Sequence, residues 1–194
     1  MKSLFLLVTI ATLTLFSQPA SAQLKSTVLT SGTMLADAKL TVEQLIERAE
    51  SKMTAQDYQG AIKDYTQAIE LSPKDPEPYS RIAYIYVIQN NHGEAVKAFS
   101  QYLKMANADS ISQKDYADRG LSYHAIGDYQ NAISDFNQAI KIEPLYGSGY
   151  YYRGLTYQAL GQKQEALADF KRVLEVDKEH PEAEEIMKTI KELQ

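Results

Sequence analysis

The sequence predicts an all-α fold, an α-solenoid of helix-turn-helix repeats, and two observations support that prediction. The first is a period: four alanines in similar local sequence lie 34, 37 and 34 residues apart, at Ala61, Ala95, Ala132 and Ala166. The second is that residues 57–73 match residues 128–144 almost position by position. A fixed period of this length is typical of solenoids, whose surfaces serve binding rather than catalysis.

Residues 1–22 have the pattern of a secretory signal peptide. Lys2 supplies a positive start, residues 4–16 are a run of apolar residues and threonine, and residues 20–22 read Ala-Ser-Ala, a cleavage site of small residues. The run is shorter than the roughly 20 residues that a membrane span needs. We therefore expect export without stable membrane insertion after cleavage, with a retained N-terminal anchor as the alternative. Residues 23–40 are predicted to be a flexible leader.

Composition excludes several classes of function. The net charge of −5 and the lack of a basic stripe disfavour nucleic acid as a partner. The chain has no cysteine, which excludes disulfides, thiolate catalysis and cysteine-type zinc sites. Its three histidines are too far apart in sequence for a metal site, and no motif indicates a cofactor. Export without cysteine favours a bacterial periplasm or secretion, or the thylakoid lumen if the source is a cyanobacterium.

The repeat domain is predicted to span residues 41–194. Its repeats cover about 42–75, 76–109, 113–146 and 147–180, and a capping helix occupies 181–194. The expected helix pairs are 42–55 and 58–71, 76–89 and 92–106, 113–126 and 129–142, and 147–160 and 163–176. Thr41 with Gln44 is a capping box that begins the first helix. Gly127 and Gly161 can take the left-handed conformation that ends the first helix of their repeats, and Asn90 is a tolerated substitute.

A three-residue insertion near residues 110–112 separates repeats two and three. We expect the second helix of repeat two to run long and the superhelical angle to change there. Elsewhere, small residues face large aromatic ones where two helices cross, as Gly120 and Ala132 do with Phe136. Arg119 and Arg153 are expected to lie along this packing seam. The many carboxylates are expected to be solvated on helix faces.

A small residue, an aromatic residue, alanine, a second aromatic residue and proline recur in register, and this motif resembles the tetratricopeptide repeat. The resemblance covers residues 42 to about 178, with departures such as Leu45 for tryptophan and Gln56 for glycine. It implies that the first helices of the repeats line a concave groove that holds a peptide. The predicted groove residues are Ile46, Glu50, Met53, Tyr84, Ile88, Leu121, His124, Tyr151, Leu155 and Gln158.

Two features of this groove remain open to more than one interpretation. Tyr84, Leu121 and Leu155 either anchor an apolar segment or pack between adjacent first helices. The run Tyr150-Tyr151-Tyr152 points to three sides of its helix, with Tyr150 expected in the core, Tyr151 in the groove and Tyr152 nearer a rim. A cofactor or sugar site is the alternative interpretation of this aromatic cluster. The clamp by which chaperone-binding members hold a C-terminal carboxylate is not matched, because Glu50 and Asp118 occupy positions that need an asparagine and an arginine.

No phosphate-binding loop, nucleophile elbow or metalloprotease motif is present. The sequence therefore predicts a non-catalytic, exported protein-protein interaction scaffold that binds a protein or peptide segment in its groove and assists complex assembly. The alternatives are a self-associating structural protein and a carrier of a small apolar ligand in the groove. The oligomeric state is not predicted.

Overall fold

The computed structural model describes residues 40–193. The predicted signal peptide at 1–22 and nearly all of the predicted leader at 23–40 lie outside the described residues. Every element of the described part is helical, which confirms the predicted all-α class. The elements are α2 (Val42–Thr54), α3 (Tyr58–Leu71), α4 (Glu77–Ile88), α5 (His92–Met105), η1 (Ala108–Ser110), α6 (Gln113–Ala125), α7 (Tyr129–Ile142), α8 (Gly147–Ala159), α9 (Lys163–Val176) and α10 (Ala183–Leu193).

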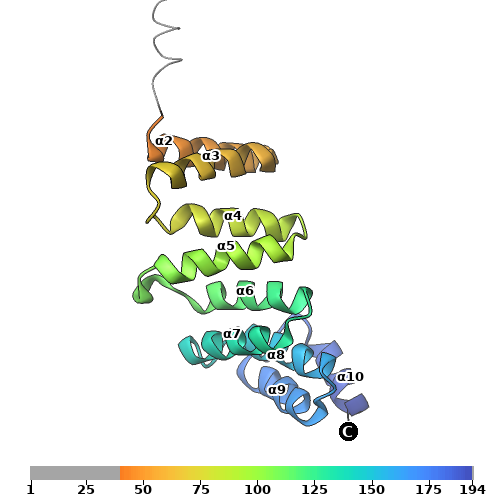
Figure 1. Ribbon diagram of the computed structural model, residues 1–194. Helices are drawn as coiled ribbons and strands as arrows, with labels where there is room; N and C mark the ends of the chain where they lie inside the picture. The colour runs from red at the N-terminus through yellow and green to blue at the C-terminus, as the bar shows by residue number, and fades with distance from the viewer. Residues whose placement is uncertain (1–39, 194) are drawn as a thin grey trace, which may run out of the picture. The chain divides into compact units, whose positions relative to one another are not determined.

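These helices form hairpins that stack in chain order within residues 41–193 (Figure 1). The hairpins are α2–α3, α4–α5, α6–α7 and α8–α9, and the second helix of each one packs against the first helix of the next. We call α2, α4, α6 and α8 the A helices and α3, α5, α7 and α9 the B helices. The bounds of these helices agree with the predicted bounds to within one residue at each end.

The turn inside each hairpin uses one residue with positive φ. These residues are Gln56, Asn90, Gly127 and Gly161, with φ of 61°, 56°, 79° and 73°. Glycine adopts this conformation without steric cost, asparagine tolerates it and glutamine is strained by it. In the first three turns the next residue is an aspartate or asparagine, whose side chain accepts a hydrogen bond from a backbone N–H in the first turn of the B helix.

The core alternates small and aromatic side chains where the A and B helices cross. Ala61, Ala132 and Phe136 have no exposed surface. A Cβ atom added to Gly120 would lie 2.9 Å from Cε1 of Phe136, and one added to Gly154 would lie equally close to Phe170. The two backbones therefore approach too closely at these crossings for any residue other than glycine without a local shift.

The expectation that the second helix of repeat two runs long is wrong. Helix α5 has 14 residues, the same length as α3, α7 and α9, and ends at Met105. The extra residues form η1 and a capping box in which Ser112 and Asp115 bond each other's backbone N–H. An extended residue at Ala106 ends α5, so the insertion is absorbed by the loop.

Helix α10 closes the C-terminal end of the described hairpins. Its residue Ile186 is buried in one cluster with Phe170 and Val173 of α9, and Ile190 and Leu193 pack against the same cluster. The opposite face carries charged side chains, among them Lys188, which pairs with Glu185 at 3.7 Å. An amphipathic helix of this kind gives the last hairpin an apolar cover and a polar exterior.

Candidate functional site

The ten predicted groove residues all lie on the four A helices, and we call this set the A-helix face. Glu50, Ile88 and Gln158 are exposed, and the other seven are half-buried. Ile46, Met53 and Tyr84 pack on one core cluster, Leu121 on the next, and Tyr151 and Leu155 on the last. The face therefore combines partial exposure with contacts to the core in every hairpin.

At its N-terminal end, the A-helix face is joined across hairpins by ionic contacts. Arg81 of α4 places Nη2 3.3 Å from Oε1 of Glu50 on α2 and 3.1 Å from Oε1 of Glu77 on its own helix. All three side chains are about half exposed. Two carboxylates share one guanidinium, so this group carries a net negative charge.

Tyr84 is fixed by a contact between α4 and α6. Its hydroxyl donates a hydrogen bond of 2.6 Å to Oδ2 of Asp118, and its ring lies edge-on to Phe99 at 5.4 Å between centroids. Lys114 lies 5.0 Å above the Tyr84 ring and 3.7 Å from the Asp118 carboxylate. Burial raises the pKa of the Tyr84 hydroxyl, and the hydrogen bond to Asp118 adds to the increase. Tyr84 thus has a structural role in addition to its half-exposed ring surface.

Asp118 is a carboxylate held mostly away from water. Its side chain is 18% exposed, and burial raises its pKa, although the Tyr84 hydroxyl and Lys114 both lower it. The negatively charged Asp115 on the same helix adds to the rise. The sequence identified Asp118 only as a residue that does not match the carboxylate clamp of chaperone-binding members. It did not indicate the contact of Asp118 with Tyr84 of the neighbouring A helix.

His124 joins α6 to α8 through Thr156. The Nδ1 atom of His124 lies 2.9 Å from Oγ1 of Thr156, and that hydroxyl donates its own proton to the carbonyl oxygen of Tyr152 at 2.7 Å. The histidine must therefore carry its proton on Nδ1, which donates to Thr156. Burial lowers the pKa of His124. The ring of His124 also packs edge-on against Tyr129 at 5.3 Å.

The tyrosine run separates along α8 as the helical period requires. Tyr151 contacts the ring of Tyr152 at 5.2 Å between centroids and that of His180 at 5.1 Å. Tyr152 stacks on Phe136 at 6.1 Å, while the Tyr150 hydroxyl donates to the carbonyl of Pro144 at 3.2 Å. Burial raises the pKa of Tyr151 and of Tyr152, and nearby carboxylates add to both shifts.

Three pairs of an arginine with a buried aspartate join A helices to B helices, and the sequence analysis did not identify them. Arg48 bonds Asp64, Arg119 bonds Asp135 and Arg153 bonds Asp169, each through Nε and Nη2 at 2.6–2.8 Å. The expectation that the carboxylates are all solvated is wrong for these aspartates, which are at most 5% exposed. The aspartate in each pair follows its arginine by 16 residues, a signal that was present in the sequence.

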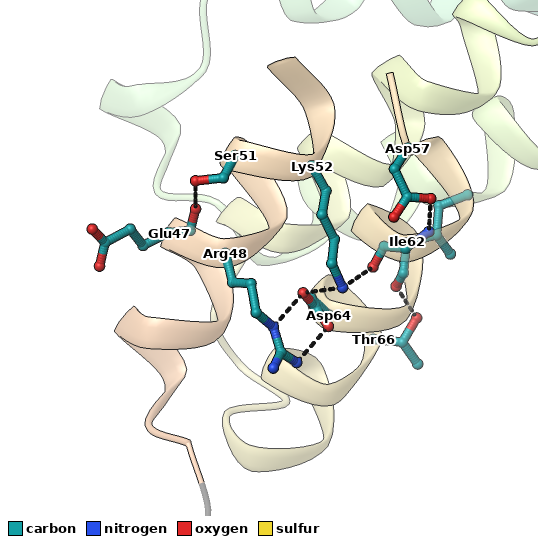
Figure 2. A network of polar contacts seen from close by, with 9 residues as sticks. Glu47, Arg48, Ser51, Lys52, Asp57, Ile62, Asp64 and Thr66 are labelled. Carbon is teal, nitrogen blue, oxygen red and sulfur yellow. Dashed lines mark hydrogen bonds and ion pairs between the residues drawn. The ribbon is translucent and has the colours of Figure 1, made fainter. Parts of the chain in front are cut away.

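Each pair has additional partners that link it to its surroundings. Lys52 also reaches Asp64 at 2.8 Å (Figure 2). Arg119 donates a further hydrogen bond to Ser100 of the preceding B helix at 3.2 Å. Repeat two has Ile82 and Ala98 at the equivalent positions, both buried, so an apolar pair replaces the ion pair there.

None of these groups has the arrangement of a metal centre. The described part of the chain holds no group of three or more His, Cys, Asp or Glu side chains placed to bind a metal ion. Among the helices of residues 40–193, none is both long enough and apolar enough to cross a lipid bilayer.

Comparison with protein-family models matches most of the described residues. Two models described as tetratricopeptide repeat match residues 148–180 and 76–109, and one described as TPR repeat matches 53–89 and 120–161. Together they match more than half of the chain.

Curated relatives share part of this region. The chain is 30% identical over 102 residues to small glutamine-rich tetratricopeptide repeat-containing protein 2 of Mycosarcoma maydis and 29% identical over 102 residues to human serine/threonine-protein phosphatase 5. Both alignments include 53% of this chain, but only 28% and 20% of those proteins. The activities of the whole relatives therefore do not transfer.

Solved structures give the same fold. The MamA protein matches 78% of this chain and 80% of its own with a TM-score of 0.71 at 20% identity. YrrB, described as a TPR protein with an unusual peptide-binding site, matches 84% of this chain and 91% of its own with a TM-score of 0.66 at 17% identity. At these identities the likeness concerns the fold alone.

Proposed function

The chain belongs to the tetratricopeptide-repeat family, and from this premise we propose that it is a non-catalytic scaffold that binds a segment of a partner protein on its A-helix face. The observation that carries the proposal is the composition and exposure of that face. Partly exposed aromatic and aliphatic side chains come from successive hairpins, as Tyr84, Leu121 and Leu155 do, and the exposed polar side chains of Glu50 and Gln158 belong to the same face.

The site of action belongs to the same proposal. The signal-peptide pattern of residues 1–22 supports export, and the absence of cysteine fits a bacterial envelope. We propose that the protein works outside the cytoplasm and assists assembly of a complex there. Fractionation of its own host, with the full chain compared with one lacking residues 2–22, tests this, because loss of the segment should retain the protein in the cytoplasm.

The test of the face uses two isoleucines that differ mainly in their position. Ile88 at the end of α4 is 52% exposed and lies on the A-helix face, whereas Ile142 at the end of α7 is 45% exposed and lies on a B helix. We expect Ile88→Asp to reduce the capture of crosslinked partners from the host and Ile142→Asp to leave it unchanged. Equal capture by both variants would show that the A-helix face is the wrong surface.

Ile88 is a better choice than Tyr84 for this test. Tyr84→Ala would remove the hydrogen bond to Asp118 and the contact with Phe99, so lost binding could not be separated from lost packing. Circular dichroism of both isoleucine variants should match that of the parent protein. Light scattering over a range of concentrations tests the self-association alternative, and native mass spectrometry of protein from its own host tests the small-ligand carrier.

A further inference from the structure

Two cations of the A helices are already paired with carboxylates of the same helices. Arg81 serves both Glu50 and Glu77, and Lys114 lies against Asp118. Three carboxylates thus share two cations in this part of the described structure. An acidic segment bound here would have to break one of these pairs, whereas a basic segment meets an excess of negative charge.

The C-terminal half of the face joins aromatic rings to carboxylates. We call Tyr151, Tyr152 and Glu182 the tyrosine–carboxylate cluster. The two rings lie 5.2 Å apart, and Glu182 is the residue immediately before α10. Its Oε2 atom lies 3.1 Å from Nδ1 of His180, the ring that packs on Tyr151. Glu182 is exposed, with 44% of its side chain open to solvent.

The negative charge of Glu182 acts on both rings. After burial, the negative charges of Glu182 and Asp118 are the causes that raise the pKa of Tyr152, and Glu182 also raises that of Tyr151. Glu182, in the turn before α10, therefore influences both rings of α8, and Asp118 on α6 adds to the effect at Tyr152 alone. A cation bound at this position is stabilised by the faces of the aromatic rings and also by the negative charge of the carboxylates.

We propose that the partner segment is basic, and that a lysine or arginine side chain of that segment binds at the tyrosine–carboxylate cluster. This inference rests on the proposed function, since it specifies the chemistry of a segment bound to the A-helix face. The apolar residues of the segment contact Leu121 of α6 and Leu155 of α8. The backbone of the segment continues along the A-helix face toward α4. Affinity falls as salt is added, because the charge excess is partly exposed.

The experiment is a selection of 12-residue peptides from a random phage-displayed library on the full folded protein. The library is first depleted on the Ile88→Gln, Leu155→Gln double variant, which leaves the charge of the face unchanged and whose circular dichroism should match that of the parent protein, so that the peptides retained depend on the A-helix face. We expect the selected pool to contain at least twice the lysine and arginine content of the input library. A synthetic copy of the most enriched peptide is then titrated by fluorescence anisotropy.

Two single variants separate the cluster from general charge. Glu182→Gln should weaken the synthetic peptide about threefold to tenfold, which is the range of one exposed cation contact with a carboxylate and a ring. Glu165→Gln removes the same charge from the start of α9, a B helix, and should leave the affinity unchanged. Replacing the lysines and arginines of the peptide by glutamine should reduce affinity at least as much as Glu182→Gln does.

The outcomes distinguish the two proposals. Enrichment of neutral or acidic peptides, or a Glu182→Gln variant that binds the basic peptide as well as the parent protein, overturns the inference and leaves the scaffold intact. Failure of any face-dependent peptide to be enriched counts against the proposed function itself, and the inference falls with it.

Discussion

The buried pair of Arg119 and Asp135 permits a prediction in which the chain supplies its own control. Repeat two carries Ile82 and Ala98 at the equivalent positions, so the same fold accommodates an apolar pair there. We consider three variants of repeat three: Asp135→Ala, Arg119→Ile and the double change. The double variant reproduces in repeat three what repeat two already contains.

The expected costs follow from what each change leaves behind. In Asp135→Ala the guanidinium loses both bonds of 2.7 Å, but its side chain is 19% exposed and keeps Ser100, so we expect a loss of about 2–3 kcal/mol in the free energy of unfolding. Arg119→Ile leaves a carboxylate that is 5% exposed without its cation, at a cost of about 3–5 kcal/mol. The double variant leaves no unpaired charge and should lie within about 1.5 kcal/mol of the parent protein.

The measurement is urea unfolding, followed by circular dichroism and by intrinsic tyrosine fluorescence. Coincident transitions and an unchanged dependence on urea justify comparison of the free energies. Glu175→Ala, which breaks the exposed pair of Arg172 and Glu175, is the control and should cost less than about 1 kcal/mol. A double variant that is destabilised by the sum of the single losses would refute the reasoning, because the two side chains would then contribute independently.

Three further predictions concern charge and packing. Burial raises the pKa of Asp64, but Arg48 and Lys52 outweigh burial, so the pKa of Asp64 is lowered in the folded state. The parent protein should therefore lose stability as pH falls below about 3.9, and Asp64→Asn should remove this pH dependence in thermal melts. Asp118 has a raised folded-state pKa and the opposite sign: the parent protein should lose stability relative to Asp118→Asn as pH rises from about 3.9 through that pKa, and a flat difference contradicts this. Gly120→Ala should cost about 1–3 kcal/mol, because its Cβ meets Phe136 at 2.9 Å, whereas Gly93→Ala in α5, with no atom within 4 Å, should stabilise by about 0.5–1 kcal/mol in the same urea titration.

The helices were predictable because local signals and the repeat period agreed. Thr41 and Gln44 form the predicted capping box at the start of α2, and Gly127 has the predicted positive φ. Gln56 was identified as a departure from glycine, and it adopts the same left-handed conformation. The hairpin fold imposes that turn whatever residue occupies it, so the strain at Gln56 is met by the packing of α2 on α3.

The length of α5 was not predictable from the insertion count alone. Three additional residues could extend a helix or enlarge a loop, and both satisfy the period. The loop was favoured because Ser112 and Asp115 form a capping box that begins α6, while Ala106 takes an extended conformation that ends α5. A serine followed three residues later by an acidic residue was a signal for the start of a helix, and it places the extra residues before that start.

The buried aspartates show a different limit. Arginine and aspartate are usually exposed, so an isolated Arg119 gives no reason to place it against a buried carboxylate. The information lies in the comparison of repeats. An aspartate follows an arginine by 16 residues in repeats one, three and four, whereas repeat two has an isoleucine and an alanine at these two positions. Paired replacement of this kind indicates spatial contact, and it could have identified these pairs before the fold was seen.

The A-helix face sets the last limit, because the helical register gives the direction of a side chain but not whether its polar atoms are already bonded. Tyr84 and Tyr151 are both predicted groove residues, although Tyr151 lies one helical turn earlier in its repeat and Leu155 is the residue equivalent to Tyr84. The Tyr84 hydroxyl bonds Asp118, whereas the Tyr151 ring packs on Tyr152 and His180. The difference arises from the next hairpin, where Asp118 is available to Tyr84 and the turn before α10 is what Tyr151 meets. Binding capacity on this face therefore depends on the neighbouring repeat. At α10, which follows the last A helix, the aromatic surface of Tyr151 lies near the exposed carboxylate of Glu182.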